Sequence, residues 1–178
     1  MSMTLQSSYN DSPSGPSAGS LDGGPAVKSS YKQADTVSIP FGFPIAFKPS
    51  PTTDQDVYVP AASTDKIAGF LFRSDAYSRS WTDENGTHGE LDSTGVRPGF
   101  MINGARKGRI RVPCHTGCVP GDRLFVAYNN TGATYTAAGQ LGNVAEAGHA
   151  IDCSNQGQWT STAAADGLAW LEFDFVNK

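Results

Sequence analysis

The amino-acid sequence predicts an all-β protein, a barrel or a sandwich, behind a flexible N-terminal arm. Three observations predict this fold class. Residues 37–47 place apolar side chains at every second position, which is the period of a β-strand. Glycine (20) and proline (11) are frequent among the 178 residues and favour turns over long helices. The alanine-rich stretch 133–150 contains three glycines, so it allows at most a short helix.

The beginning of the chain differs in composition from the rest. Roughly half of residues 1–30 are Ser, Gly or Pro, and the sizeable apolar or aromatic residues after Met3 are Leu5, Tyr9, Leu21 and Val27. Such a segment buries too little apolar surface to offset the entropy lost on ordering. We therefore expect residues 1–35 to form a flexible arm, with an inert tail as the alternative, and residues 36–178 to form the folded domain.

The strongest strand pattern is "VSIPFGFPIAF", whose alternation puts one apolar set on a single face: Val37, Ile39, Phe41, Phe43, Ile45 and Phe47. Two prolines on the other face remove backbone donors, which predicts an edge strand or a bend at Gly42. Shorter strands are expected at 57–59, 67–72, 100–102, 109–112, 124–128 and 168–176. Turn residues separate them, including Asn103-Gly104 and Lys107-Gly108. The polar stretch 73–95 is expected to be a long loop.

Charge and hydropathy exclude several classes of protein. The net charge of −4 argues against a dedicated nucleic-acid binder. There is no apolar run long enough to span a membrane. The N-terminus lacks the basic and apolar regions of a secretory signal. The three cysteines are therefore expected to be free thiols in a protein folded in a reducing cytosol.

The stretch Cys114-His115-Thr116-Gly117-Cys118 has two interpretations. A zinc site would need two further ligands, which Cys153 with His149 or His88 could supply. The stretch also follows a strand and precedes Pro120-Gly121-Asp122, where a turn is expected. The turn is the preferred interpretation, and no bound metal or other cofactor is predicted.

Catalytic patterns are missing from the sequence. It contains no Gly-x-Ser-x-Gly elbow and no phosphate-binding glycine motif. An acidic group, Asp83, Glu84, Glu90 and Asp92, lies in the polar loop without an apolar pocket around it. The sequence therefore predicts that the protein is not an enzyme.

The densest group of positive charge is Arg106, Lys107, Arg109 and Arg111. On a strand, Arg109 and Arg111 share one face, and Ile110 and Val112 share the other. The basic side chains either contact an acidic partner surface or form a solvated face; both interpretations remain open.

A series of segments in a fixed order points to a family. "IPFGFPIAF" is followed by "DKIAGFLFRSDAY", "GVRPGFMINGARKGRIRV", "VPGDRLFVAYNNTGATY" and a closing "ADGLAWLEFDFV". In this order they resemble the small capsid decoration proteins of tailed bacteriophages, the structural cement proteins, from about Gly24 to the C-terminus. The 73–95 loop and residues 1–23 are longer than that family leads us to expect.

The resemblance implies a compact β-barrel or jelly-roll-like domain. It also implies a non-catalytic virion protein, made in the bacterial cytoplasm, that binds the outer surface of an assembled head and bridges capsomers. It implies the major capsid protein as partner, a homo-oligomer (dimer or trimer), and no direct contact with nucleic acid or membrane. The expected capsid or subunit interface comprises Val27, Tyr31, Arg106, Lys107, Arg109 and Arg111.

Two other functions remain as alternatives. A receptor- or carbohydrate-binding domain of a head fibre would stack sugars on exposed rings, with Trp81, Trp159 and Trp170 as candidates. A small β-barrel hydrolase or metal-dependent protein would use Cys114, His115 and Cys118.

Overall fold

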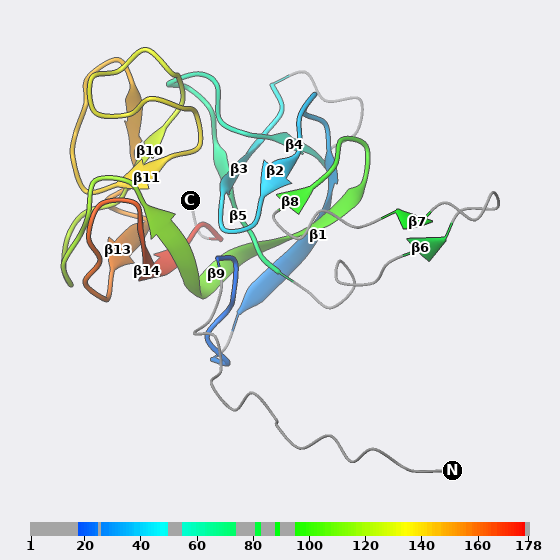
Figure 1. The fold of residues 1–178 in the computed structure, drawn as a ribbon, viewed down its shortest axis with the longest axis horizontal. Helices are drawn as coiled ribbons and strands as arrows, with labels where there is room; N and C mark the ends of the chain where they lie inside the picture. Colours follow the sequence, from blue (N-terminus) through cyan, green and yellow to red (C-terminus); the bar gives the residue numbers. More distant parts are fainter. Residues whose placement is uncertain are drawn as a thin grey trace, which may run out of the picture.

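A computed structural model of the protein describes residues 18–24, 26–49, 55–73, 81–82, 88–89 and 95–176. Within these ranges the chain forms β-strands, turns and irregular segments, and no helix (Figure 1). None of the described residues therefore belongs to a helix long and apolar enough to cross a membrane. The all-β prediction is confirmed.

The first half of the molecule is a closed barrel. Its sheet runs in the order β1-β4-β3-β5-β9, and β1 also pairs with β9, which closes the ring. The strands are β1 (Val27–Gln33), β3 (Pro44–Phe47), β4 (Asp56–Tyr58), β5 (Ile67–Leu71) and β9 (Met101–Cys114). The barrel core has Ile39, Ile45, Val57, Leu71 and Ile102 at its centre, all fully buried.

The second half continues from the far end of β9. Here β9 pairs with β14 (Gly167–Asp174), which pairs with β13 (Gly157–Trp159). A separate sheet of β11 (Leu141–Gly142), β10 (Phe125–Ala127) and β12 (Ala150–Asp152) packs beside them (Figure 1). These elements enclose the second core, which contains Ile110, Val112, Leu124, Trp159 and Leu171. Strand β9 therefore belongs to both halves.

Two short strand pairs complete the described fold. Strand β2 (Ile39–Pro40) pairs with β8 (Gly95–Val96), and β6 (Trp81–Thr82) pairs with β7 (His88–Gly89). The predicted loop 73–95 thus contains strands, and most of its other residues, including the acidic group 83–92, lie outside the described residues.

The predicted bend at Gly42 is confirmed. Gly42 has a φ of +84°, and it separates β2 from β3. A Cβ there would lie 3.1 Å from the Gly19 nitrogen and 3.3 Å from Pro113 Cδ, so both conformation and space favour glycine. The single apolar face fails at Val37, which is 60% exposed and lies in the connection between β1 and β2.

The predicted turns at Asn103-Gly104 and Lys107-Gly108 are wrong, because both dipeptides lie inside the 14-residue strand β9. Gly104 serves close packing: a Cβ there would lie 2.6 Å from Tyr31 Cε2 and 2.7 Å from Ile45 Cδ1. The two predicted strands 100–102 and 109–112 are consequently one continuous strand.

The predicted end of the arm at residue 35 falls too late. Residues 27–33 form β1, which pairs antiparallel with β9 and parallel with β4. Residues 18–22, which we call the N-terminal segment, also lie against β9, where Leu21 and Ile110 form an isolated β-bridge. Residues 1–17 of the arm lie outside the described residues. The composition of residues 27–33 does not indicate a strand, because β1 is stabilised by pairing with β4 and β9, which are distant in sequence.

Candidate functional site

The basic cluster lies on β9 where this strand passes from the barrel to the second core. Ile110 and Val112 are fully buried, as the alternation predicts, and the side chains of Lys107 and Arg109 reach the opposite, outer face. Val27, at the start of β1, pairs with Lys107 and is 41% exposed. The structure thus brings most of the predicted interface residues together.

Tyr31 does not belong to this surface. Its side chain is buried in the barrel core, with its ring edge-on to Phe47 at 5.9 Å. The prediction that Tyr31 contacts a partner is therefore wrong, because the ring fills the space above Gly104.

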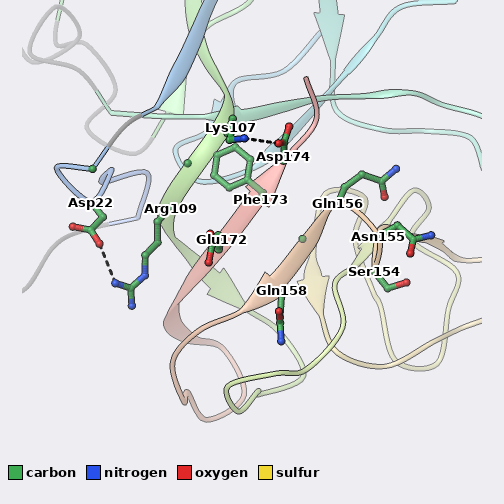
Figure 2. Close-up of a pocket in the computed structure, with 13 residues that line it drawn as sticks. Asp22, Lys107, Arg109, Ser154, Asn155, Gln156, Gln158, Glu172, Phe173 and Asp174 are labelled. Carbon is green, nitrogen blue, oxygen red and sulfur yellow. Dashed lines mark hydrogen bonds and ion pairs between the residues drawn. The ribbon is translucent and has the colours of Figure 1, made fainter. Parts of the chain in front are cut away.

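Acidic side chains lie opposite the basic ones. Lys107 Nζ is 2.7 Å from Asp174 Oδ2, and Arg109 Nη1 is 2.9 Å from Asp22 Oδ2 (Figure 2). Glu172 is the cross-strand neighbour of Arg109. Acids from distant parts of the chain therefore balance the charges of Lys107 and Arg109. Each pair is solvent-exposed and contributes little stability by itself.

The arginines make further contacts. Arg109 Nε donates to Thr160 Oγ1 at 3.1 Å, and its guanidinium lies 5.1 Å from the centre of the Trp170 ring. Arg106 donates to the Phe175 carbonyl at 3.3 Å. The buried Nε atoms of Arg106 and Arg111 have no hydrogen-bond partner among the described residues. Arg106 and Arg109 therefore hold parts of the fold together.

A polar groove of about 480 Å³ runs beside this cluster. One wall carries Asp22 and Arg109, and the other carries Asn155, Gln156 and Gln158 (Figure 2). Its charged side chains are mostly paired with one another, and it contains no arrangement of nucleophile and base. The groove offers hydrogen-bonding groups but no catalytic geometry.

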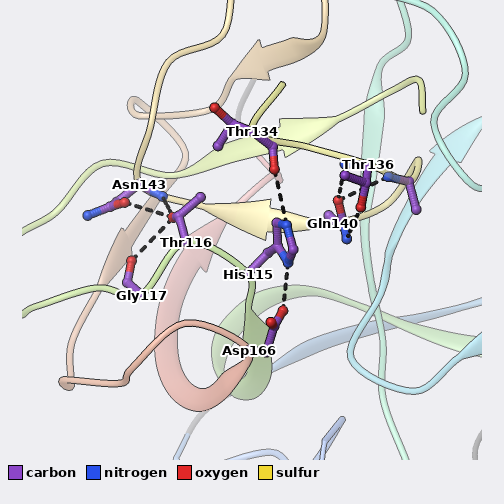
Figure 3. A network of polar contacts seen from close by, with 9 residues as sticks. His115, Thr116, Gly117, Thr134, Thr136, Gln140, Asn143 and Asp166 are labelled. Carbon is purple, nitrogen blue, oxygen red and sulfur yellow. Dashed lines mark hydrogen bonds and ion pairs between the residues drawn. The ribbon is translucent and has the colours of Figure 1, made fainter. Parts of the chain in front are cut away.

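The Cys114–Cys118 stretch is a bend that joins β9 to the second half. His115 Nδ1 lies 2.6 Å from Asp166 Oδ1, and His115 Nε2 lies 3.1 Å from the Thr134 carbonyl (Figure 3). Both neighbouring oxygens are hydrogen-bond acceptors. Asp166 has a φ of +59°, the only positive value among the described non-glycine residues. His115 thus links three loops.

The cysteines are buried free thiols. Burial raises the pKa of Cys114 and of Cys153 to about 12, so neither is a ready thiolate ligand or nucleophile. Of the other ligands that the alternative zinc site would need, His149 has its Nδ1 2.7 Å from Asn129 Oδ1, and the side chain of His88 lies outside the described residues. The described residues contain no group of three or more His, Cys, Asp or Glu side chains that could hold a metal ion.

The tryptophan candidates for sugar stacking fare differently. Trp159 is fully buried and donates to the Gly142 carbonyl, so it cannot stack on a ligand. Trp170 is half-buried, and Arg109 lies over its ring. The side chain of Trp81 lies outside the described residues.

Exposed apolar side chains occur in two regions that the sequence did not reveal. The first apolar patch is Val37 (60% exposed), Phe100 (45%) and Met101 (53%). Gln33 bonds the backbone of two of these residues: its side chain donates to the Val37 carbonyl, and its backbone N–H donates to the Phe100 carbonyl.

The second apolar patch is Val119 (52% exposed) and Val144 (41%). Asp122 contacts Val119 and the residue before Val144: it accepts from the Val119 N–H at 3.0 Å and from Asn143 Nδ2 at 2.7 Å. This patch lies beside the second core, whereas the first lies at the barrel end of β9.

Comparison with known proteins decides the family. The family model described as structural cement protein (E217 gp24/Pam3 gp6) matches residues 5–174. The chain belongs to this family of phage structural cement proteins. No curated protein sequence matches the chain. A chain of the solved structure "The capsid of Myoviridae Phage XM1" superposes with a TM-score of 0.61 and 14% identity, over 98% of this cement protein and 100% of that chain.

Family membership fixes the coarse function. The cement protein has a structural, capsid-stabilising role in a phage virion, where it associates with capsid components. The similarity to the XM1 capsid chain supports the same all-β fold. The resemblance predicted from the ordered segments is therefore confirmed.

Proposed function

We propose that this cement protein binds the outer surface of an assembled phage head and bridges neighbouring capsomers, with the major capsid protein as its direct partner. The observation that carries the proposal is the presence of two separate exposed apolar patches, one at each end of β9. Each patch contacts a different capsomer, and β9 is the connection between them.

Physical reasoning supports a bridge over a single contact. Each patch contains only two or three apolar side chains, so each contact alone is weak, at about 25 cal/mol per Å² buried. When two weak sites are linked at a fixed spacing, the second binds at a high effective concentration, and the pair holds much more tightly.

The connection between the patches is suited to this role. Strand β9 is bonded to β1 in the barrel and to β14 in the second half, so it is supported along its whole length. Capsomers held at its two ends therefore resist separation through a continuous, hydrogen-bonded ladder.

The outer-surface location, the homo-oligomer and the role of the arm are further parts of the proposal. An arm can add contacts by ordering on the capsid, which suits the composition of residues 1–17. Several arms in one oligomer would raise avidity further.

Sedimentation with purified expanded heads tests the proposal. One variant carries Val37→Ser, Phe100→Ser and Met101→Ser, and a second carries Val119→Ser and Val144→Ser. We expect each to weaken head binding at least tenfold, or about 1.4 kcal/mol. Leu168→Ser is the matched control, since Leu168 is also exposed (38%) but belongs to neither patch. Wild-type binding by both patch variants would refute the proposal.

A further inference from the structure

We infer that a pocket between the two halves of the fold binds the side chain of a lysine of the major capsid protein, with Asp65 holding its ammonium group. The pocket has a volume of about 260 Å³. Its lining comes from the start of β5, from β12 with the turn after it, and from Phe175, directly after β14. The identity of the partner rests on the proposed function, whereas the preference for an ammonium group follows from the pocket itself.

Asp65 is a buried carboxylate with one oxygen left over. It is 8% exposed, and its Oδ2 accepts hydrogen bonds from the N–H groups of Ala61 at 2.8 Å and Ala62 at 2.9 Å. Burial, followed by a hydrogen bond and the charge of Asp65, raises the pKa of Tyr58, so the hydroxyl beside this carboxylate stays protonated. The other oxygen, Oδ1, is buried and accepts no hydrogen bond from any described residue. Because a buried acceptor without a donor is unfavourable, Oδ1 is expected to meet a donor from outside the chain.

Two more acceptors line the same pocket. Gln156, which also borders the polar groove, has a buried Oε1 without a hydrogen-bond partner among the described residues. Asp152 is exposed at the mouth, where hydrogen bonds from the side chain and the N–H of Ser154 lower the pKa of its carboxyl. An ammonium group has three donors and no acceptor, which matches these three acceptor side chains.

The positive charges of the chain leave these acceptors free. Lys66 lines the pocket and is exposed, but no ion pair within the described part of the chain joins it to Asp65 or Asp152. The charge of Arg123 adds to the effect of Ser154 on the pKa of Asp152, but Arg123 does not line the pocket. Two carboxylates against one lysine leave an excess of negative charge, which is complementary to a cationic ligand.

The apolar part of the lining selects a lysine side chain among cations. Ile67 and Ile151 are half-buried, and Phe175 is buried. Lysine packs its methylene groups against such surface and keeps its ammonium group among polar atoms. These walls offer no oxygen ligand to a metal ion. Arginine fits less well, because Asp65 has one free oxygen and cannot receive a bidentate guanidinium.

A lysine built into the pocket tests its preference. Gln156→Lys supplies an ammonium group from the chain itself, and Gln156→Met is the uncharged control of similar length. We expect Gln156→Lys to unfold at a Tm at least about 2 °C above that of Gln156→Met, and the difference to vanish when both carry Asp65→Asn. Equal Tm values with Asp65 intact would overturn the inference. So would a rise in the wild-type Tm with CaCl2 that Asp65→Asn abolishes, because the pocket would then hold a metal ion.

Carbodiimide cross-linking of cement protein bound to purified heads identifies the source of the lysine. The reagent joins a carboxylate to a neighbouring amine as an amide, and Asp152 is the exposed carboxylate of the pocket. We expect peptide mass spectrometry to find an amide between Asp152 and a capsid-protein lysine. Gln156→Lys should make it at least about tenfold less abundant, because the built-in ammonium group occupies the site. Cross-links from Asp166, whose side chain is 75% exposed outside the pocket, should not change.

The outcomes separate the lysine pocket from the proposed bridge. Cement protein that sediments with heads but forms no amide from Asp152 to the capsid protein overturns the lysine pocket and leaves the bridge intact. Amides from Asp152 to a second copy of this chain alone overturn the choice of partner. Cement protein that does not sediment with heads contradicts the proposed function, and the Tm comparison then still decides whether the pocket prefers an ammonium group.

Discussion

Phe70 is expected to be the most costly phenylalanine to truncate, because it joins the two halves of the fold. It lies on β5 of the barrel, is fully buried, and packs edge-on against Phe173 with ring centres 4.9 Å apart. Its ring is also 5.8 Å from that of Phe175. Replacing a buried phenylalanine by alanine removes its transfer free energy and leaves a cavity, at about 3–5 kcal/mol.

A loss of about 3–5 kcal/mol is large compared with the free energy of unfolding of a typical protein, which is about 5–15 kcal/mol. For a chain of this length it corresponds to a fall in Tm of roughly 6–20 °C. Phe70→Leu keeps most of the volume but loses the ring contacts, so an intermediate loss is expected.

Urea unfolding followed by tryptophan fluorescence measures the effect. Phe100→Ala is the matched control: it removes the same side chain from the first apolar patch, where it is 45% exposed, and should change stability by no more than about 0.5 kcal/mol. The reasoning fails if Phe70→Ala costs less than about 1 kcal/mol, or if the two alanine variants are equally destabilised.

Three further predictions concern the loops, the ion pair and the arm. Glu146 accepts the backbone N–H groups of residues 133–135, which lower the pKa of its carboxyl; its stabilisation is complete above the unfolded-state value and lost as pH falls through the folded-state value. Glu146→Gln should therefore reduce stability at neutral pH and weaken its acid dependence, as measured by urea unfolding across pH. Arg109→Glu should destabilise, and Asp22→Arg in the same chain should restore about 0.5 kcal/mol, in a double-mutant cycle. Deleting residues 1–17 should leave Tm unchanged while weakening head binding at least tenfold in sedimentation, and undiminished binding would exclude the arm from the contact.

Patterns of local origin could be predicted from the sequence. The bend at Gly42 and the outward direction of Arg109 follow from alternation and from proline and glycine chemistry, which act within a few residues. The strands around Val57, Phe70, Val126 and Leu171 were found in the same way.

Features that depend on distant partners could not be predicted. Asn103-Gly104 has the composition of a turn, yet Gly104 lies in a strand because it pairs with Ser29 and Leu71, and its missing side chain leaves room for the Tyr31 ring. Strand β1 was missed because pairing with β9 and β4, rather than its own apolar content, stabilises it. The acids opposite Lys107 and Arg109 are likewise 67 and 87 residues away in the chain.

The two apolar patches show the same limit. The sequence presents Phe100 and Met101 as the apolar start of a strand, which equally describes core residues. Their exposure at the surface is seen only in the folded structure, where Gln33 at the end of β1 donates to the Phe100 carbonyl.

Thermal rupture of expanded heads, measured with saturating cement protein, tests the central claim of a bridge most directly. Wild-type protein should raise the rupture temperature. A variant with Val119→Ser and Val144→Ser, added until the heads are saturated, should still bind through the first patch but give little or no rise, because a subunit held at one end cannot hold two capsomers together. If heads saturated with this variant rupture at the same raised temperature as heads with wild-type protein, the two patches do not form a bridge.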